Sequence, residues 1–143
     1  MNTIAELVLL IPLLLLSLSA HEFAHGKMAD LLGDPTPKMT GRLTLNPLAH
    51  LSLMGTLVLL VTRRFGWAKP VQVNPRYFDD QRKGMMLVGL AGPVANIILA
   101  LSFALLFKFT RIGLSQFIDY RIINKLFIVG ITLNLGLALF NLI

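Results

Sequence analysis

Cysteine is absent from this chain of 143 residues. Without cysteine the protein can form neither a disulfide nor a thiolate metal site, so any metal ligand must be histidine, aspartate or glutamate. Those residue types are also scarce, because the chain has only three histidines and seven acidic residues. A metal site would therefore have to be built from very few side chains.

Charged residues are sparse as well. Only 14% of the residues are charged, whereas 55% are hydrophobic, and the mean hydropathy is +0.73. Soluble domains of this size are rarely so apolar, so the composition predicts an integral, multi-pass membrane protein. The formal net charge is +6. Because the basic residues lie between apolar runs, we expect them to contact lipid headgroups of the bilayer and not nucleic acid.

The apolar runs predict an all-α fold with about four transmembrane helices in a single domain, residues 1–143. The predicted spans are residues 3–32, 48–63, 80–108 and 124–143. No basic stretch precedes the first run, so we expect it to be retained and not cleaved as a signal peptide. The second span is shorter than the about 20 apolar residues that a full crossing needs. Basic residues are nearly balanced between alternate loops, which leaves the membrane orientation undecided.

Two connecting segments have features of extended structure. Residues 36–50 show partial alternation and contain threonines, which predict a short strand or hairpin. Residues 65–80 contain two prolines that exclude a continuous helix, and residues 71–73 could form one extended piece. Exposed strands cannot lie in lipid, so both segments are expected at the interface or packed against the spans.

At the end of the first apolar run the sequence reads His21-Glu22-Phe23-Ala24-His25. On a helix, His21 and His25 lie one turn apart on the same face. Two imidazoles at this spacing can bind one Zn²⁺, and the glutamate after the first histidine can act as general base on a zinc-bound water. The candidate metal ligands are therefore His21 and His25, and the candidate catalytic residue is Glu22.

Chance is the simpler explanation of a pattern that fixes only three positions. Inside hydrocarbon, however, ionisable groups are costly unless they are paired or functional, so chance is the weaker explanation here. Ser17 extends the two histidines into a polar stripe that should face protein or water and not lipid.

Small and amide residues mark the later spans. Gly89 and Gly92 share a face with Asn96, which predicts close helix packing, and Asn134 and Asn141 share a face of the last span. Interhelical contact is the simpler interpretation of such asparagines. As an alternative, Asn96 or Asn141 could donate a hydrogen bond to a substrate carbonyl or to the oxyanion that develops from it.

Four motifs follow one another along the chain. They are His21–Gly26, Gly41–His50, Gly66–Val71 and Ala91–Asn96, which read HEFAHG, GRLTLNPLAH, GWAKPV and AGPVAN. In this order and spacing they resemble the site-2 protease family of intramembrane zinc metalloproteases, most closely its minimal branch without a PDZ domain. The resemblance covers nearly the whole chain.

The resemblance implies an enzyme of a prokaryotic cell membrane that holds Zn²⁺. Its substrates would be transmembrane proteins, and it would hydrolyse a peptide bond within or next to a transmembrane helix. The resemblance also implies that residues 36–50 and 65–75 form membrane-associated β-like segments near the active site. For Asn141, it supports a contact with the substrate carbonyl or the oxyanion.

The chain departs from the family pattern at two places. After His50 the family has an Asp-Pro pair where this chain has Ser52-Leu53, which affects only a local turn. The family's third zinc ligand is an aspartate about two helical turns after the position of Asn141. This sequence ends two residues after Asn141, so we expect it to be truncated before that motif. Among the residues present, the alternatives for a third ligand are Asp30, Asp34 and, as the best of them, His50.

Two other functions compete with a protease. A catalytically inactive or truncated relative could bind transmembrane partners as a scaffold, which the missing aspartate favours and the intact histidine motif disfavours. A metal transporter would also use intramembrane histidines, but it should distribute ligands over several spans. The last two spans have no His, Asp or Glu in their apolar cores, so a transporter ranks last.

Overall fold

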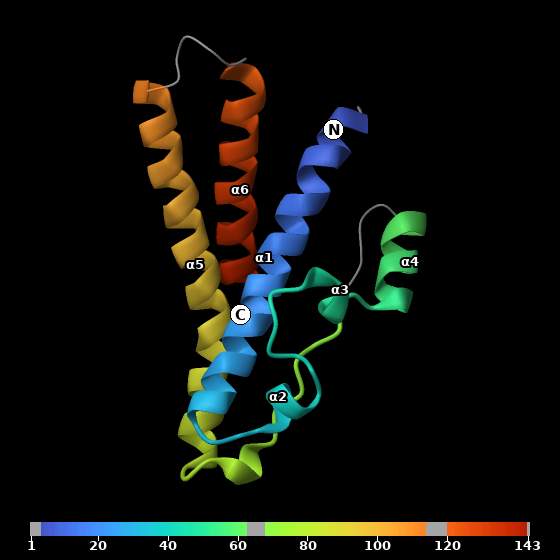
Figure 1. The fold of residues 1–143 in the computed structure, drawn as a ribbon, viewed down its shortest axis with the longest axis vertical. Coiled ribbons are helices and arrows are strands. Elements are labelled where there is room, and N and C mark those ends of the chain that lie inside the picture. Colours follow the sequence, from blue (N-terminus) through green and yellow to red (C-terminus); the bar gives the residue numbers. More distant parts are fainter. Residues whose placement is uncertain (1–3, 63–67, 114–119, 143) are drawn as a thin grey trace. The chain divides into compact units, whose positions relative to one another are not determined.

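The computed structural model describes residues 4–62, 68–113 and 120–142. Four helices account for most of this part of the chain: α1 (Ile4–Leu31), α4 (Leu53–Thr62), α5 (Gln81–Gly113) and α6 (Tyr120–Phe140) (Figure 1). Three single turns connect them: α2 (Thr36–Met39), α3 (Pro47–His50) and the 3₁₀ turn η1 (Pro75–Tyr77). The described residues contain no strand, only one isolated antiparallel bridge between Leu51 and Ala68. The helical part of the predicted fold class is confirmed.

The contacts divide the chain into two compact units. Residues 18–92 form one of them, here called the motif unit because it contains the histidine motif. Residues 1–17 and 93–143 form the other, here called the helix-pair unit because α6 packs in it against the C-terminal part of α5. The helices α1 and α5 each contribute residues to both units.

In the motif unit, α1 ends at Leu31, one residue before the end of the first predicted span. Gly33 has a φ of 96°, a left-handed conformation that only glycine adopts easily. This lets the N–H of Asp34 turn back and donate to the carbonyl of Ala29 at 3.0 Å, which satisfies a carbonyl at the helix end. A small apolar core of Ala29, Phe78 and Val88 joins the end of α1 to the start of α5.

The strand or hairpin predicted for residues 36–50 is wrong. The segment instead forms the two single helical turns α2 and α3, separated by irregular chain. Proline explains the difference, because Pro37 and Pro47 lie in the first helical positions, where their fixed φ favours a helical turn. The side chain of Asn46 caps α3 by accepting a hydrogen bond from the N–H of Leu48 at 3.1 Å. The β-like structure implied for residues 65–75 is likewise absent from the described residues 68–75, apart from the single bridge.

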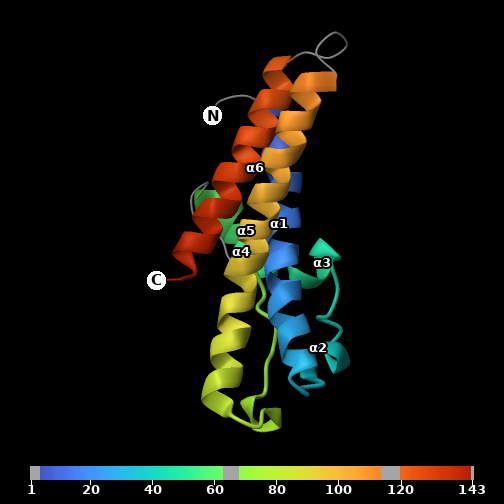
Figure 2. The ribbon, with the colours of Figure 1, turned by 90° about the vertical axis from the view of Figure 1, so that its left-hand side faces the viewer.

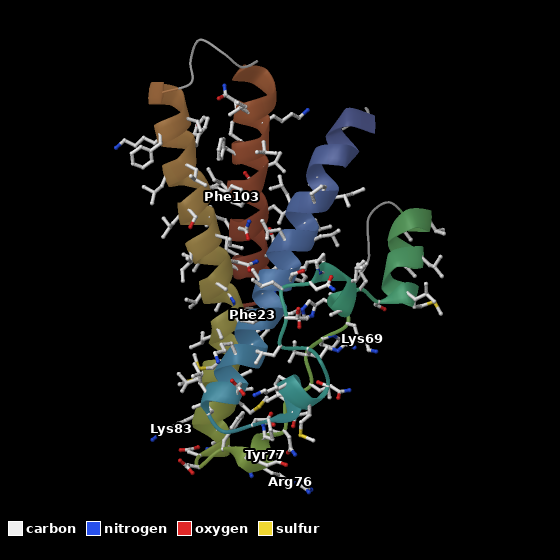
Figure 3. The ribbon with its side chains drawn as sticks, in the orientation of Figure 1. Phe23, Lys69, Arg76, Tyr77, Lys83 and Phe103 are labelled. Atoms are coloured by element: carbon white, nitrogen blue, oxygen red, sulfur yellow. The ribbon has the colours of Figure 1, made fainter. Side chains whose placement is uncertain are left out.

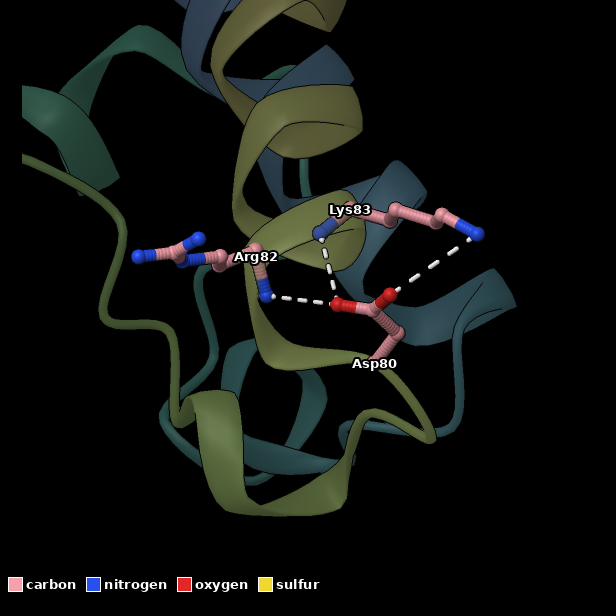
Figure 4. Close-up of polar contacts among 3 residues, drawn as sticks. All are labelled: Asp80, Arg82 and Lys83. Carbon is pink, nitrogen blue, oxygen red and sulfur yellow. Dashed lines mark hydrogen bonds and ion pairs between the residues drawn. The ribbon is translucent and has the colours of Figure 1, made fainter.

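The start of α5 is capped by an aspartate. One carboxylate oxygen of Asp80 accepts hydrogen bonds from the N–H groups of Arg82 at 3.0 Å and Lys83 at 3.1 Å (Figure 4). The other oxygen lies 3.8 Å from the Lys83 ammonium. This arrangement satisfies two of the N–H groups that a helix start leaves free. Arg76 and Tyr77 on η1 lie at the same end of the motif unit as Lys83, whose side chain points to the other side (Figure 3).

In the helix-pair unit, α6 lies beside the C-terminal part of α5 (Figures 1 and 2). The rings of Phe103 and Phe107 on α5 contact Phe127 on α6, with ring centroids 6.4 Å and 5.5 Å apart. A Cβ added to Gly130 would lie 3.1 Å from the Phe103 ring, so the small residue allows α6 to approach this ring.

Two helices among the described residues are long and apolar enough to cross a membrane, Gln81–Thr110 and Ile123–Phe140. These correspond to the third and fourth predicted spans. The helix α4 has only 10 residues, which at 1.5 Å per residue is about half of the hydrocarbon thickness. The crossings predicted at residues 3–32 and 48–63 therefore remain predictions.

Candidate metal centre

The two motif histidines converge on one point. His21 is 4% exposed, and its Nε2 atom lies 3.0 Å from Nε2 of His25, which is one helical turn further along α1. Their rings meet edge to face, with centroids 4.6 Å apart. Zinc–nitrogen bonds of about 2.1 Å at a tetrahedral angle would separate the two nitrogens by about 3.4 Å. The pair is therefore arranged to give two ligands to one metal ion.

A backbone carbonyl on α5 orients His25. The Nδ1 atom of His25 lies 2.6 Å from the carbonyl oxygen of Val88. A carbonyl can only accept, so Nδ1 carries the proton and donates it. In the neutral ring, Nε2 then carries a lone pair, which can accept a hydrogen bond from Nε2 of His21, 3.0 Å away, or bind a metal ion. Hydrogen bonds such as the one to Val88 commonly fix the tautomer and orientation of metal-binding histidines.

Gly92 provides the space next to the two nitrogens. A Cβ built on Gly92 would lie 2.6 Å from Nε2 of His21 and closer still to Nε2 of His25. Side-chain carbons do not approach other atoms so closely, so only glycine fits while the histidines hold these positions. A side chain at Gly92 would fill the point on which both nitrogens converge. The donor set and this free space both fit a metal ion.

Glu22 lies on the same turn of α1 as the histidine pair. Its Oε2 atom accepts a hydrogen bond of 3.0 Å from the backbone N–H of Val71, which is 49 residues away in the sequence. No bond to Oε1 is found among the described residues. The carboxylate is thus held through one oxygen, and the other is available for proton transfer.

His50 has a different environment from the histidine pair. It is 2% exposed, and its Nε2–H donates to the carbonyl of Thr44 at 2.8 Å. Its own carbonyl accepts from the N–H of Lys69 at 2.7 Å. Within the part of the chain that the structure describes, no three His, Cys, Asp or Glu side chains are grouped to hold a metal. The structure therefore does not bring His50, Asp30 or Asp34 into one metal-binding group with His21 and His25.

The two asparagines singled out in the sequence belong to the helix-pair unit. Asn96 is fully buried, and neither its amide nitrogen nor its amide oxygen has a hydrogen-bond partner among the described residues. Asn141 lies just after α6 and is exposed, and its amide donates to the carbonyl of Leu137 in the last turn of α6 at 2.8 Å. The proposed contact of either residue with a substrate stays a prediction.

The chain was compared with known proteins. It is 44% identical over 132 residues, 91% of its length, to "Putative zinc metalloprotease YwhC" of Bacillus subtilis. It is 34% identical over 105 residues, 70% of its length, to "Putative zinc metalloprotease Rip2" of Mycolicibacterium smegmatis. The chain is a homologue of these two proteins. The resemblance to the site-2 protease family that its motifs carry is thereby confirmed.

The chain spans 60% of the length of the B. subtilis relative and 40% of the mycobacterial one. No family model matches it, and no solved structure matches it.

Sequence reasoning missed the backbone groups that complete the site. The carbonyl of Val88 and the N–H of Val71 carry no signal in the sequence, because every residue has a carbonyl and nearly every one has an N–H. For Gly92 the sequence contains a partial signal, since small residues on one helix face predict close packing. It could not show that the atoms packed against Gly92 are histidine nitrogens.

Proposed function

We propose that the chain carries the catalytic core of an intramembrane zinc metalloprotease. It would hydrolyse peptide bonds within or next to the transmembrane helices of substrate proteins in a prokaryotic cell membrane. The observation that carries the proposal is the convergence of His21 and His25 on the space at Gly92, with Glu22 on the same turn. The printed names of the two relatives and the apolar length of α5 and α6 support it.

A zinc ion held by His21 and His25 would polarise the scissile carbonyl and supply an activated water. The protein's own contribution is proton transfer by Glu22. With Oε2 held by the N–H of Val71, Oε1 takes a proton from the attacking water and later gives it to the nitrogen of the leaving amine.

A catalytic zinc site normally has three protein ligands, and the histidine pair supplies two of them. In the family that the motifs resemble, the third ligand is an aspartate about two helical turns after the position that Asn141 occupies. His50 is the alternative within this chain, although its Nε2–H is engaged with the carbonyl of Thr44.

A transmembrane substrate must unwind before attack, because a helix satisfies its own peptide groups. The N–H of Val71 donates to Glu22, so residues 71–73 run next to the candidate base. We propose that these residues receive the unwound stretch by strand addition. The buried amide of Asn96 is a candidate donor to the substrate carbonyl, and Asn141 is a second one.

The test is cleavage of a model substrate by detergent-purified protein. The substrate is a single Leu/Ala helix of about 20 residues with a central Asn-Pro pair, carrying a fluorophore and a quencher at its two ends. Glu22→Gln keeps the shape of the side chain and removes the base, so we expect turnover to fall about 100-fold or more while zinc stays bound. Lys27→Gln, an exposed change on the same helix, should cleave normally.

Normal turnover by Glu22→Gln would contradict the proposed mechanism. If wild-type protein binds the model helix without cleaving it, the non-catalytic scaffold is the better explanation.

A further inference from the structure

One buried carboxylate has no part in the proposed chemistry. Asp34 lies beyond the end of α1 and is 0% exposed. A buried carboxylate is costly unless its oxygens accept hydrogen bonds. Here Oδ1 accepts from the N–H of Thr36 at 2.9 Å, which is a local turn, and Oδ2 accepts from the N–H of Asn74 at 2.7 Å. The second bond joins residues 40 positions apart in the sequence, so Asp34 attaches a distant segment to the end of α1.

The attached segment, residues 68–74, lies along α1. A Cβ added to Gly26 would lie 3.3 Å from the side chain of Val71, so this side chain packs against the backbone of α1 at Gly26. Further along, Val73 packs against the small core that contains Ala29. The segment therefore follows α1 toward its C-terminal end.

Few hydrogen bonds fix this segment, because it has no regular secondary structure and only one bridge, at Ala68. Three of its N–H groups have acceptors elsewhere in the motif unit. The N–H of Lys69 donates to the carbonyl of His50, that of Val71 to Glu22, and that of Asn74 to Asp34. Two carboxylates, on Glu22 and Asp34, thus tie the segment to α1 and to its end, through N–H groups that lie three residues apart in the segment.

We propose that Asp34 is a positioning residue for Glu22. By holding the N–H of Asn74, Asp34 fixes where the segment lies along α1, and this places the N–H of Val71 against Oε2 of Glu22. Asp34 acts through the segment, and a small shift of a group near the reacting atoms is enough to lower a rate strongly. The inference rests on the proposed role of Glu22 as general base.

The test is Asp34→Asn, with Asp30→Asn as the matched control. Asparagine keeps the size of the side chain but has one acceptor oxygen, so the N–H of Thr36 or of Asn74 loses its acceptor. Asp30 lies nearby on α1 but makes only a local ion pair with Lys27 at 3.1 Å. Hydrogen exchange, zinc per chain, and kcat and KM on the model helix are measured for both variants and for wild-type protein.

For Asp34→Asn we expect exchange of the Val71 amide to become about tenfold faster and kcat to fall about tenfold or more. KM and zinc content should stay near their wild-type values, and Asp30→Asn should change none of these quantities.

An unchanged Val71 amide or an unchanged kcat in Asp34→Asn would overturn the proposal. So would faster exchange throughout residues 18–92 together with loss of zinc, since Asp34 would then only maintain the fold. Cleavage by Glu22→Gln separates the two claims. If Glu22→Gln is inactive and Asp34→Asn is normal, only the inference about Asp34 fails, whereas an active Glu22→Gln refutes the role of the base itself.

Discussion

At the scale of single residues, the site depends on what surrounds two histidines. The spacing of His21 and His25 on a helix follows from the sequence, because residues four apart lie on one face. The partners of these histidines do not follow from it. Val88 lies 63 residues from His25 and acts through its backbone carbonyl, so neither its identity nor its distance in the sequence reveals the contact. The sequence could thus predict the candidate ligands but not what orients them.

The first prediction at this scale concerns Gly92. In Gly92→Ala the added methyl group meets both Nε2 atoms, so the histidines or α5 must move. We expect affinity for zinc to fall about 10-fold to 100-fold, as it does when groups next to metal ligands are disturbed. Zinc titration with a competing chelator measures the change.

Gly89→Ala on the same helix is the matched control, because a Cβ at Gly89 meets no atom of the described residues within 4 Å. Wild-type zinc affinity in Gly92→Ala, or an equal loss in Gly89→Ala, would show that the space at Gly92 does not serve the metal site.

At the scale of elements, the sequence predicted some helix boundaries correctly and predicted the wrong secondary structure for one connecting segment. The first predicted span ended at residue 32 and the third began at residue 80, each within one residue of the helix boundaries at Gly33 and Asp80. The φ of glycine and the acceptors of aspartate act locally at these boundaries. Residues 36–50 misled because a partial alternation of polar and apolar residues resembles a strand. Pro37 and Pro47 favour helical turns there instead, and no neighbouring strand is present in the described residues to pair with the segment.

The packing of α6 against α5 gives a prediction at this scale. In Gly130→Ala the new methyl group lies 3.1 Å from the Phe103 ring, which must shift to accommodate it. We expect the helix pair to lose about 1 kcal/mol of stability, at the low end of the cost of overpacking. The stability of this variant is measured by unfolding in an increasing fraction of a denaturing detergent. The control is Gly136→Ala, whose added methyl group meets no atom of the described residues within 4 Å. Equal stability of the two variants would contradict the contact.

At the scale of the whole molecule, composition predicted a membrane protein, and two helices among the described residues are long and apolar enough to cross a bilayer. A hydropathy pattern does not predict where a helix starts and ends. The second predicted span comprised residues 48–63, but its first residues form α3 and a break precedes α4. The long-range hydrogen bonds of Glu22 and Asp34 could not be predicted from the sequence either, since they join residues 49 and 40 positions apart.

The central claim is that His21 and His25 hold a catalytic zinc ion. The measurement that tests it most directly is zinc per chain in purified wild-type protein, His21→Ala and Glu22→Gln. The account predicts that His21→Ala loses the zinc, because one of two converging nitrogens is gone, whereas Glu22→Gln retains it. Equal zinc in His21→Ala and wild-type protein would contradict the account.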